Sequence, residues 1–361
     1  MFNYKRLILA RKRRRLTGKG LAELAGLSAI TVSRLENGEN QPDEETVAKL
    51  ARALGYPAEF FADDDPEEID TSAVSFRSLT KMSAKERDAA IAAGCLGLQL
   101  SDWVEREFRL PKPNILDLSY ETDPEAAARA LRQFWSLGEK PIGDVLGLLE
   151  VNGLRVFSLK EDTSLVDAFS FWRNERPFVF LNNFKTAEHS IYDSVHELGH
   201  LAMHRHAGTD TGKNSSRSAE REANRFASAF LMPANDVRAR MPGFITVDTI
   251  IAAKKRWRVS AMAMAYRLHA LGLLSEWQYK SACIELGRRG FRTAEPNGID
   301  RESSRVWQKV LAQLWNERKT KNHIAASLHI PLDELEGLIW GLAGQNVRPD
   351  REAKHAIRAV N

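Results

Sequence analysis

Apolar residues recur every three or four positions along most of the chain, which is the periodicity of amphipathic helices. Within residues 1–61 the apolar runs are short, and they stop at Gly26, Gly38 and Gly55. Glycine tolerates the left-handed backbone conformation that commonly follows the last turn of a helix. The pattern therefore predicts an all-helical domain over residues 1–61. A longer helical pattern over residues 83–108 ends before two prolines, which mark a boundary.

Short strands are expected only in the middle of the chain. Helices over residues 124–137 and 141–152 precede runs of β-branched and aromatic residues, which are typical of strands. These runs are residues 155–159, 168–172 and 178–181, with a turn at residues 173–177. Helical periodicity then returns over residues 187–205, 218–231, 234–240, 246–256, 260–271, 276–289, 301–316, 320–328 and 332–342. The predicted fold class is multidomain and mostly α, with an α+β core that contains a small sheet.

The composition is that of a globular protein. Its 361 residues are enough for two or three domains of about 100–200 residues each. Hydrophobic residues make up 43% and charged residues 28% of the chain, which excludes a disordered or fibrous protein. No apolar run approaches the ~18 residues of a membrane span, and the basic start lacks the apolar core of a secretory signal. Cys95 and Cys283 lie far apart and are expected to be buried, in a reducing cytoplasm.

The net charge is only +4, but the charges are distributed unevenly along the chain. Residues 1–20 carry eight lysines and arginines and no acid, which favours an end of the chain that faces a polyanion. Residues 59–70 carry seven acids and no base, which favours a solvated linker. Four segments are therefore expected: a helical domain over 1–61, an acidic linker and connecting helix over 62–119, a larger domain over 120–296, and a C-terminal helical domain over 297–361.

The sequence His196-Glu197-Leu198-Gly199-His200 carries the strongest chemical signal. It lies in the helix expected over residues 187–205, where positions i and i+4 are about 40° apart around the axis, so both imidazoles can point at one ion. Zinc takes two neutral imidazole nitrogens from such a pair. Glu197 would then lie beside a metal-bound water and serve as its general base.

A catalytic zinc also needs a third protein ligand, and the helix expected over residues 218–231 offers two acids. Glu220 lies about 60° from the centre of the apolar face of this helix and Glu222 about 100°, so Glu220 points more nearly inward. A buried carboxylate is costly unless a cation compensates it, which makes Glu220 the preferred ligand and leaves Glu222 as the alternative. Asn224, one turn later, is expected to orient a ligand imidazole. His204 extends the histidine stripe and is expected on the surface or behind the ligands, with a fourth ligand as the alternative.

The histidine motif is followed by the segment Glu220–Ala227 and by Leu231-Met232-Pro233. Together these features resemble the ImmA/IrrE metallopeptidase family, over roughly residues 120–296. The resemblance implies a zincin-like domain with a gluzincin-like site, in which the two histidines and Glu220 hold zinc and Glu197 is the base. Known members cleave phage-type repressors and so derepress stress or mobile-element genes. The implied protein substrate is therefore a repressor or an antitoxin.

The N-terminal domain carries a second motif. Residues 21–28 and 31–38 together resemble the Cro/phage-repressor (XRE) helix-turn-helix. The Ser28 hydroxyl can cap the second helix, whose N-terminal residues would enter the major groove of DNA. Basic residues 11–19 are expected to contact phosphates, although a helical module that binds protein instead of DNA is the alternative. Alignment with the family gives four base-facing positions, Ala29, Ile30, Ser33 and Arg34.

These motifs lead to a first hypothesis of a cytoplasmic zinc endopeptidase fused to a DNA-binding domain. Such a protein would be a transcriptional regulator that cleaves a repressor or antitoxin in response to a signal. The second hypothesis is a non-proteolytic XRE-type regulator or antitoxin that uses the zincin domain as a sensor. A third, in which the metal only holds helices together, leaves the place of Glu197 unexplained. Phage-type repressors usually act as pairs, so a homodimer is plausible, and no membrane partner is expected.

Overall fold

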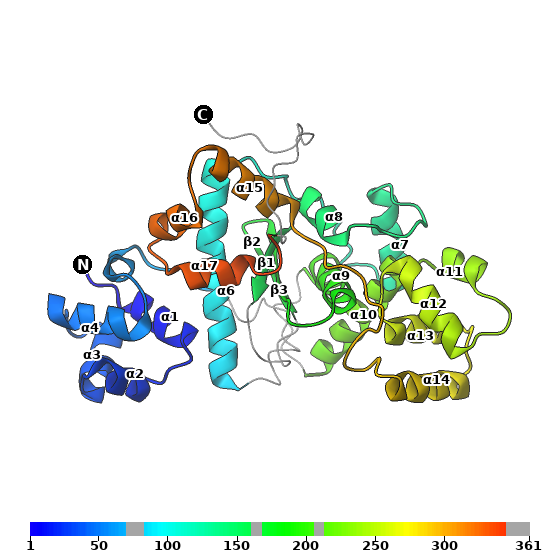
Figure 1. Ribbon diagram of the computed structural model, residues 1–361, viewed down its shortest axis with the longest axis horizontal. Coiled ribbons are helices and arrows are strands. Elements are labelled where there is room, and N and C mark those ends of the chain that lie inside the picture. Colours follow the sequence, from blue (N-terminus) through cyan, green and yellow to red (C-terminus); the bar gives the residue numbers. More distant parts are fainter. Residues whose placement is uncertain (70–82, 160–167, 206–212, 344–361) are drawn as a thin grey trace.

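The structure is a computed structural model that describes residues 1–69, 83–159, 168–205 and 213–343 (Figure 1). The described chain is mostly helical and contains one small sheet, as the hydrophobic pattern predicts. The sheet lies near the centre of the elongated molecule, between the N-terminal helices at one end and the helices up to α14 (Glu276–Arg288) at the other (Figure 1).

The N-terminal domain is built from short helices with well-defined ends. Gly26 and Gly55 end the second and fourth helices with φ of 66° and 69°, the left-handed conformation that the sequence predicts at these glycines. Thr17, Ser28 and Asp43 cap helix N-termini through side-chain oxygens that accept backbone N–H bonds. The elements are α1 (Tyr4–Arg13), α2 (Gly18–Ala25), α3 (Ala29–Glu36), α4 (Glu44–Leu54) and the 3-10 turn η1 (Ala58–Ala62).

The N-cap residue of α3, Ser28, is expected to stabilise this helix. Ser28 Oγ accepts a hydrogen bond from the backbone N–H of Thr31 at 3.0 Å, so Ser28→Ala should destabilise α3 by about 1 kcal/mol. Hydrogen exchange at the amides of α3 should then become roughly five-fold faster. Ser28→Asn keeps an acceptor oxygen and should exchange as the wild type does. Unchanged exchange in Ser28→Ala would show that the cap contributes nothing to this helix.

A sheet of three strands lies against the long helix α6 (Ala84–Glu107). Its central strand β3 pairs in parallel with β1 and antiparallel with β2. The turn between β2 and β3 is shorter than the predicted 173–177, because Arg173 pairs with Arg176 and only two residues with positive φ, Asn174 and Glu175, remain outside the ladder. The strands are β1 (Arg155–Leu159), β2 (Ala168–Arg173) and β3 (Arg176–Asn182).

Stacked phenylalanines fill the space between the sheet and α6. The ring of Phe180 lies 4.7 Å from that of Phe169, centroid to centroid, and nearly parallel to it. Gly97 of α6 lies directly over Phe180, because a Cβ there would approach the ring to 2.6 Å. Side chains of alternate strand residues point to opposite faces, so Ser170 and Trp172 of β2 point away from these rings. The rings belong to Phe157, Phe169, Phe171, Phe178 and Phe180.

The opposite side of the sheet is covered by α9 (Ala187–Met203), against which α10 (Lys213–Leu231) packs. The helix starts differ from prediction by four residues or more at three places, one of which is α15 (Arg305–Asn316), which begins at Arg305 rather than 301 after its N-cap Ser304. α10 begins at Lys213 rather than 218, and α8 begins at Val145 rather than 141 because the Asp144 side chain accepts the N–H of Gly147 and caps it. The remaining helices of this region are α7 (Pro124–Phe134), α8 (Val145–Val151), α11 (Ala234–Arg240), α12 (Val247–Trp257) and α13 (Ala261–Ala270).

The last helices of the described chain return to the N-terminal domain. Helix α17 lies against β1 and α6, at the side of the sheet that faces the N-terminal helices (Figure 1). Residues 62–119, predicted as an acidic linker and connecting helix, contain α6, and residues 297–361, predicted as a C-terminal helical domain, contain α17. Both helices contribute side chains to the buried core of the described residues. The C-terminal helices are α15 (Arg305–Asn316), α16 (Lys321–Ser327) and α17 (Leu332–Ile339).

One buried carboxylate joins α17 to the N-terminal domain. Glu334 is 3% exposed, and it accepts hydrogen bonds from Arg13 Nε at 2.7 Å and from the Tyr56 hydroxyl at 3.1 Å. Arg14 Nη1 lies 3.1 Å from the same carboxylate and also donates to Asp333 at 2.8 Å. We call this set of contacts the Glu334 clamp, since it fixes the N-terminal domain against the rest of the molecule.

Candidate metal centre and helix-turn-helix

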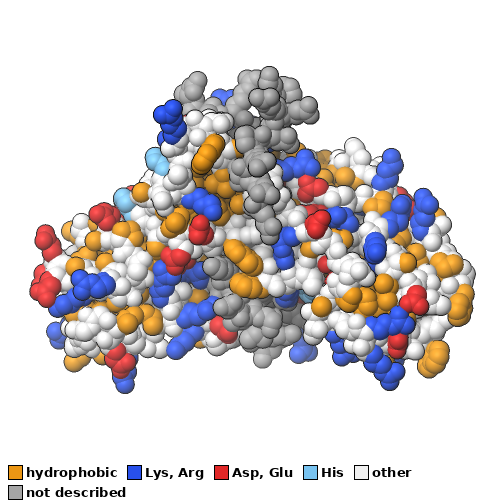
Figure 2. All heavy atoms as spheres, in the orientation of Figure 1, with side chains coloured by type: hydrophobic (Ala, Val, Ile, Leu, Met, Phe, Trp, Pro, Cys, Tyr) orange, Lys and Arg blue, Asp and Glu red, His pale blue; other side chains and the backbone are white. Residues whose placement is uncertain are grey.

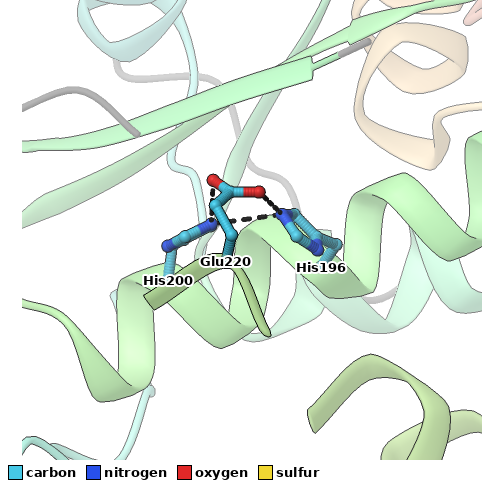
Figure 3. Close-up of side chains that lie close together, drawn as sticks. All are labelled: His196, His200 and Glu220. Carbon is cyan, nitrogen blue, oxygen red and sulfur yellow. Dashed lines mark hydrogen bonds and ion pairs between the residues drawn. The ribbon is translucent and has the colours of Figure 1, made fainter. Parts of the chain in front are cut away.

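Two imidazoles meet on the face of α9 that contacts α10. Thr186 caps the start of this helix, and its apolar side chains are buried, which fixes the direction of its polar face. His196 and His200 are one turn apart, and their Nε2 atoms lie 3.1 Å from each other (Figure 3). This is the convergence that the i, i+4 spacing predicts.

The Glu220 carboxylate of α10 completes the group. Its Oε2 lies 3.5 Å from His196 Nε2 and its Oε1 lies 3.3 Å from His200 Nε2 (Figure 3). The side chains can therefore present ligand atoms that all lie within 4.8 Å of one another. We call His196, His200 and Glu220 the His–Glu cluster.

A glycine allows the two helices to come close enough for this contact. A Cβ at Gly199 of α9 would lie 3.0 Å from the ring of Phe226 and 3.3 Å from the Cα of Ala223, both on α10. A larger residue at this position would push the helices apart. The glycine inside the histidine motif therefore brings the Glu220 carboxylate within reach of the imidazoles.

The electrostatics of the His–Glu cluster suit a cation. Burial opposes ionisation of Glu220, but its hydrogen bonds with both imidazoles lower the pKa of the carboxyl below its usual value. Burial lowers the pKa of His200 to about 4, so this imidazole is neutral at pH 7. The pKa of His196 is raised, because its bond with Glu220 and the charge of Glu197 outweigh its burial. Two imidazole nitrogens and one ionised carboxylate are a donor set that fits a divalent metal.

Glu197 lies beside the His–Glu cluster and is 3% exposed. Ser170 of β2 donates a hydrogen bond from its hydroxyl to Glu197 Oε2 at 2.6 Å. This partner was not predicted from the sequence. A serine between two phenylalanines in a buried strand is a signal that could have indicated it, because a buried hydroxyl needs a partner.

Of the three remaining polar candidates, His204 and Glu222 lie behind His200, whereas Asn224 does not. His204 Nδ1 is 3.1 Å from His200 Nδ1, and His204 Nε2 is 2.9 Å from Glu222 Oε2. Glu222, the alternative ligand in the sequence prediction, therefore contacts His204. These two residues lie at the Nδ1 side of His200, whereas Glu220 lies at its Nε2 side. The Asn224 side chain donates to the backbone carbonyl of Glu220 at 2.8 Å, so it supports the backbone of the carboxylate rather than an imidazole.

The predicted base-facing residues lie together on the exposed surface of α3. Ala29, Ile30, Ser33 and Arg34 are all exposed, whereas Val32 and Leu35 of the same helix are buried. The surface is therefore available to a partner such as DNA. Ile30 is 65% exposed, so its apolar side chain is accessible on this surface.

Three arginines of the basic segment 11–19, which was predicted to contact phosphates, bind acidic side chains of the protein instead. Arg11 binds Glu36 of α3, and Arg13 and Arg14 belong to the Glu334 clamp. These arginines neutralise acids of the chain itself, so the expectation that the run as a whole contacts phosphates needs correction. On the face shown in Figure 2, basic and acidic side chains are interspersed over the N-terminal end rather than gathered into one basic surface.

Cys95 is buried as expected, whereas Cys283 on α14 is only partly buried, and both are free thiols. Among the described residues, no helix is both long enough and apolar enough to cross a membrane.

The fold and its two sites define a helix-turn-helix domain joined to a metallopeptidase-type domain. Residues 149–269, which contain the His–Glu cluster and Glu197, match the family model of the IrrE N-terminal-like domain, a peptidase family. Residues 7–61 match the family model of the helix-turn-helix. Both matches confirm the resemblances inferred from the sequence. No curated protein matches the chain.

Proposed function

We propose that this protein is a zinc-dependent endopeptidase fused to a DNA-binding domain, and that it acts in the cytoplasm as a transcriptional regulator. Its substrate would be a phage-type repressor or an antitoxin, cut in response to a signal. The observation that carries the proposal is the buried convergence of His196, His200 and Glu220 next to Glu197. The match to the IrrE N-terminal-like domain supports it.

The residues of the site suit peptide hydrolysis. Zinc held by the His–Glu cluster would supply a Lewis acid that polarises the peptide carbonyl. Glu197 takes a proton from the attacking water as the new C–O bond forms, and it returns the proton to the amine nitrogen as the C–N bond breaks. Ser170 holds one oxygen of Glu197 in place through its hydroxyl. Burial of the carboxylate keeps this proton from bulk water.

The experiment that tests this function is a substrate screen. The zinc-loaded protein is incubated with phage-type repressors and antitoxins encoded near its gene, and the products are identified by mass spectrometry. A single cut in one of them, absent after chelation and restored by zinc, is expected. If no such protein is cut with zinc bound, the proteolytic proposal fails.

The non-proteolytic alternative has one observation in its favour. The Glu334 clamp connects the helix-turn-helix to the body that carries the His–Glu cluster, so metal binding and DNA binding would take place on one connected unit. If the metallopeptidase-type domain is a sensor, zinc changes the protection of the protein's own promoter in a footprint without any cleavage. Protection that is unaffected by zinc would exclude this sensor role.

Arg34 gives a prediction for DNA binding. Its exposed guanidinium on α3 can make two hydrogen bonds to a guanine edge, and such a pair contributes about 1–3 kcal/mol of discrimination. Arg34→Ala should therefore weaken binding to the promoter site by roughly 5- to 150-fold, measured by fluorescence anisotropy. Arg52→Ala, an exposed arginine on α4, serves as the control and should have little effect. An equal loss on promoter and unrelated DNA would contradict base recognition by Arg34.

A further inference from the structure

A row of polar side chains leads away from the His–Glu cluster behind His200. His200 Nδ1 lies 3.1 Å from His204 Nδ1, and His204 Nε2 lies 2.9 Å from Glu222 Oε2. The Ser218 hydroxyl donates to the other oxygen of Glu222 at 2.8 Å. The side chain of His204 is 13% exposed and that of Glu222 is 35% exposed, so the row runs from the interior towards solvent.

The protons in this row can be placed by elimination. His200 Nε2 faces His196 and Glu220, and it must offer a lone pair if the His–Glu cluster is to hold a metal. Its proton then resides on Nδ1, which donates to His204 Nδ1. A neutral His204 that accepts at Nδ1 carries its own proton on Nε2, which faces the Glu222 carboxylate. Each hydrogen bond in the row then has one donor and one acceptor.

The backbone fixes the same geometry. His204 is the C-cap of α9, and its backbone N–H donates to the carbonyl of His200 at 2.9 Å, which brings its ring next to the His200 ring. Glu222 is two residues after Glu220 on α10. This helix therefore places one carboxylate at the Nε2 side of His200 and a second carboxylate behind its Nδ1 side.

We propose that His204 and Glu222 are positioning residues for His200. They hold its imidazole in the tautomer and the orientation in which Nε2 can bind a divalent metal. The negative charge of Glu222 also makes Nε2 a better electron-pair donor to that metal. This inference rests on the proposed metal site. His204 is not itself a ligand, because its Nδ1 faces the side of His200 that is turned away from Glu220.

The test compares zinc affinities by competition with a chromophoric chelator, and cobalt absorption spectra, in the full-length protein. His204→Ala removes the acceptor and should weaken zinc binding by about 10- to 100-fold. His204→Asn keeps an acceptor oxygen near the position of Nδ1 and should recover most of that affinity. Glu222→Leu should weaken binding less than Glu220→Ala does. His189→Ala, at a histidine of α9 that is 51% exposed, is the matched control and should bind as the wild type does.

The outcomes separate this inference from the proposed function. If the wild type binds neither zinc nor cobalt, the metal site itself is wrong and the positioning role falls with it. If the wild type binds metal and His204→Ala binds it equally well, only the positioning role is overturned. Equal losses in His204→Ala and His204→Asn would also overturn it, because packing rather than the acceptor would then be responsible. Circular dichroism of each metal-free variant checks that the fold is retained, and Glu222→Leu provides the test if His204→Ala is unfolded.

Discussion

Replacing Glu197 with glutamine should lower the rate of peptide cleavage by about 10²- to 10⁴-fold and leave zinc binding almost unchanged. Glutamine has the same shape and keeps an oxygen that can accept the Ser170 hydroxyl, but it cannot take a proton from water. The ligand atoms of the His–Glu cluster belong to other residues, so they keep their positions. The measurements are kcat/KM on the substrate found in the screen and the zinc content of the purified variant.

A matched control separates the loss of a base from the loss of a charge. Glu276→Gln makes the same chemical change on α14, where the side chain is 61% exposed and lies outside the site, and it should cleave at the wild-type rate. If Glu197→Gln cleaves as fast as the wild type, Glu197 is not the general base and the mechanism is wrong.

The second large effect is expected at Glu220. Glu220→Ala removes one of the three proposed zinc ligands. Loss of a residue that only supports a ligand weakens metal binding by about 10- to 100-fold, so loss of a ligand itself should weaken zinc binding by more than about 100-fold. Zinc at ~100 times the wild-type Kd stabilises the wild type by about 2.7 kcal/mol, and the variant should gain far less. Thermal unfolding with and without zinc measures this difference.

The comparison with Glu222→Ala decides between the two acids of α10. Glu220 contacts both ligand imidazoles, whereas Glu222 contacts His204, so Glu222→Ala should lose less affinity than Glu220→Ala. The reverse order would show that Glu222 is the ligand, as in the alternative that the sequence left open.

Local patterns were enough to predict most of the elements and the centre of the site. Helical periodicity and the glycines at helix ends depend on residues a few positions apart, and the pairing of His196 with His200 has the same origin. Glu220 was chosen over Glu222 because of its angle to the buried face of α10, and the structure places it between the imidazoles. These are properties of single helices, which a sequence expresses directly.

What could not be predicted depends on contacts between distant parts of the chain. Ser170 meets Glu197 across the interface of β2 with α9, and no spacing in the sequence connects them. Arg13 and Glu334 are 321 residues apart, so the basic run looked available to phosphates although it binds acids of the chain. The contact of Glu222 with His204 was missed for a related reason, since His204 is the C-cap of the preceding helix.

The Glu334 clamp has a consequence for how the two halves of the molecule work together. Helix α17 contacts the sheet on one side and Arg13, Arg14 and Tyr56 on the other, so these contacts set the spacing and angle between α3 and the His–Glu cluster. A DNA-binding domain joined by a flexible linker would allow the second domain to adopt many orientations relative to the DNA. If the proposed function holds, a repressor bound to neighbouring base pairs would therefore reach the His–Glu cluster from one direction.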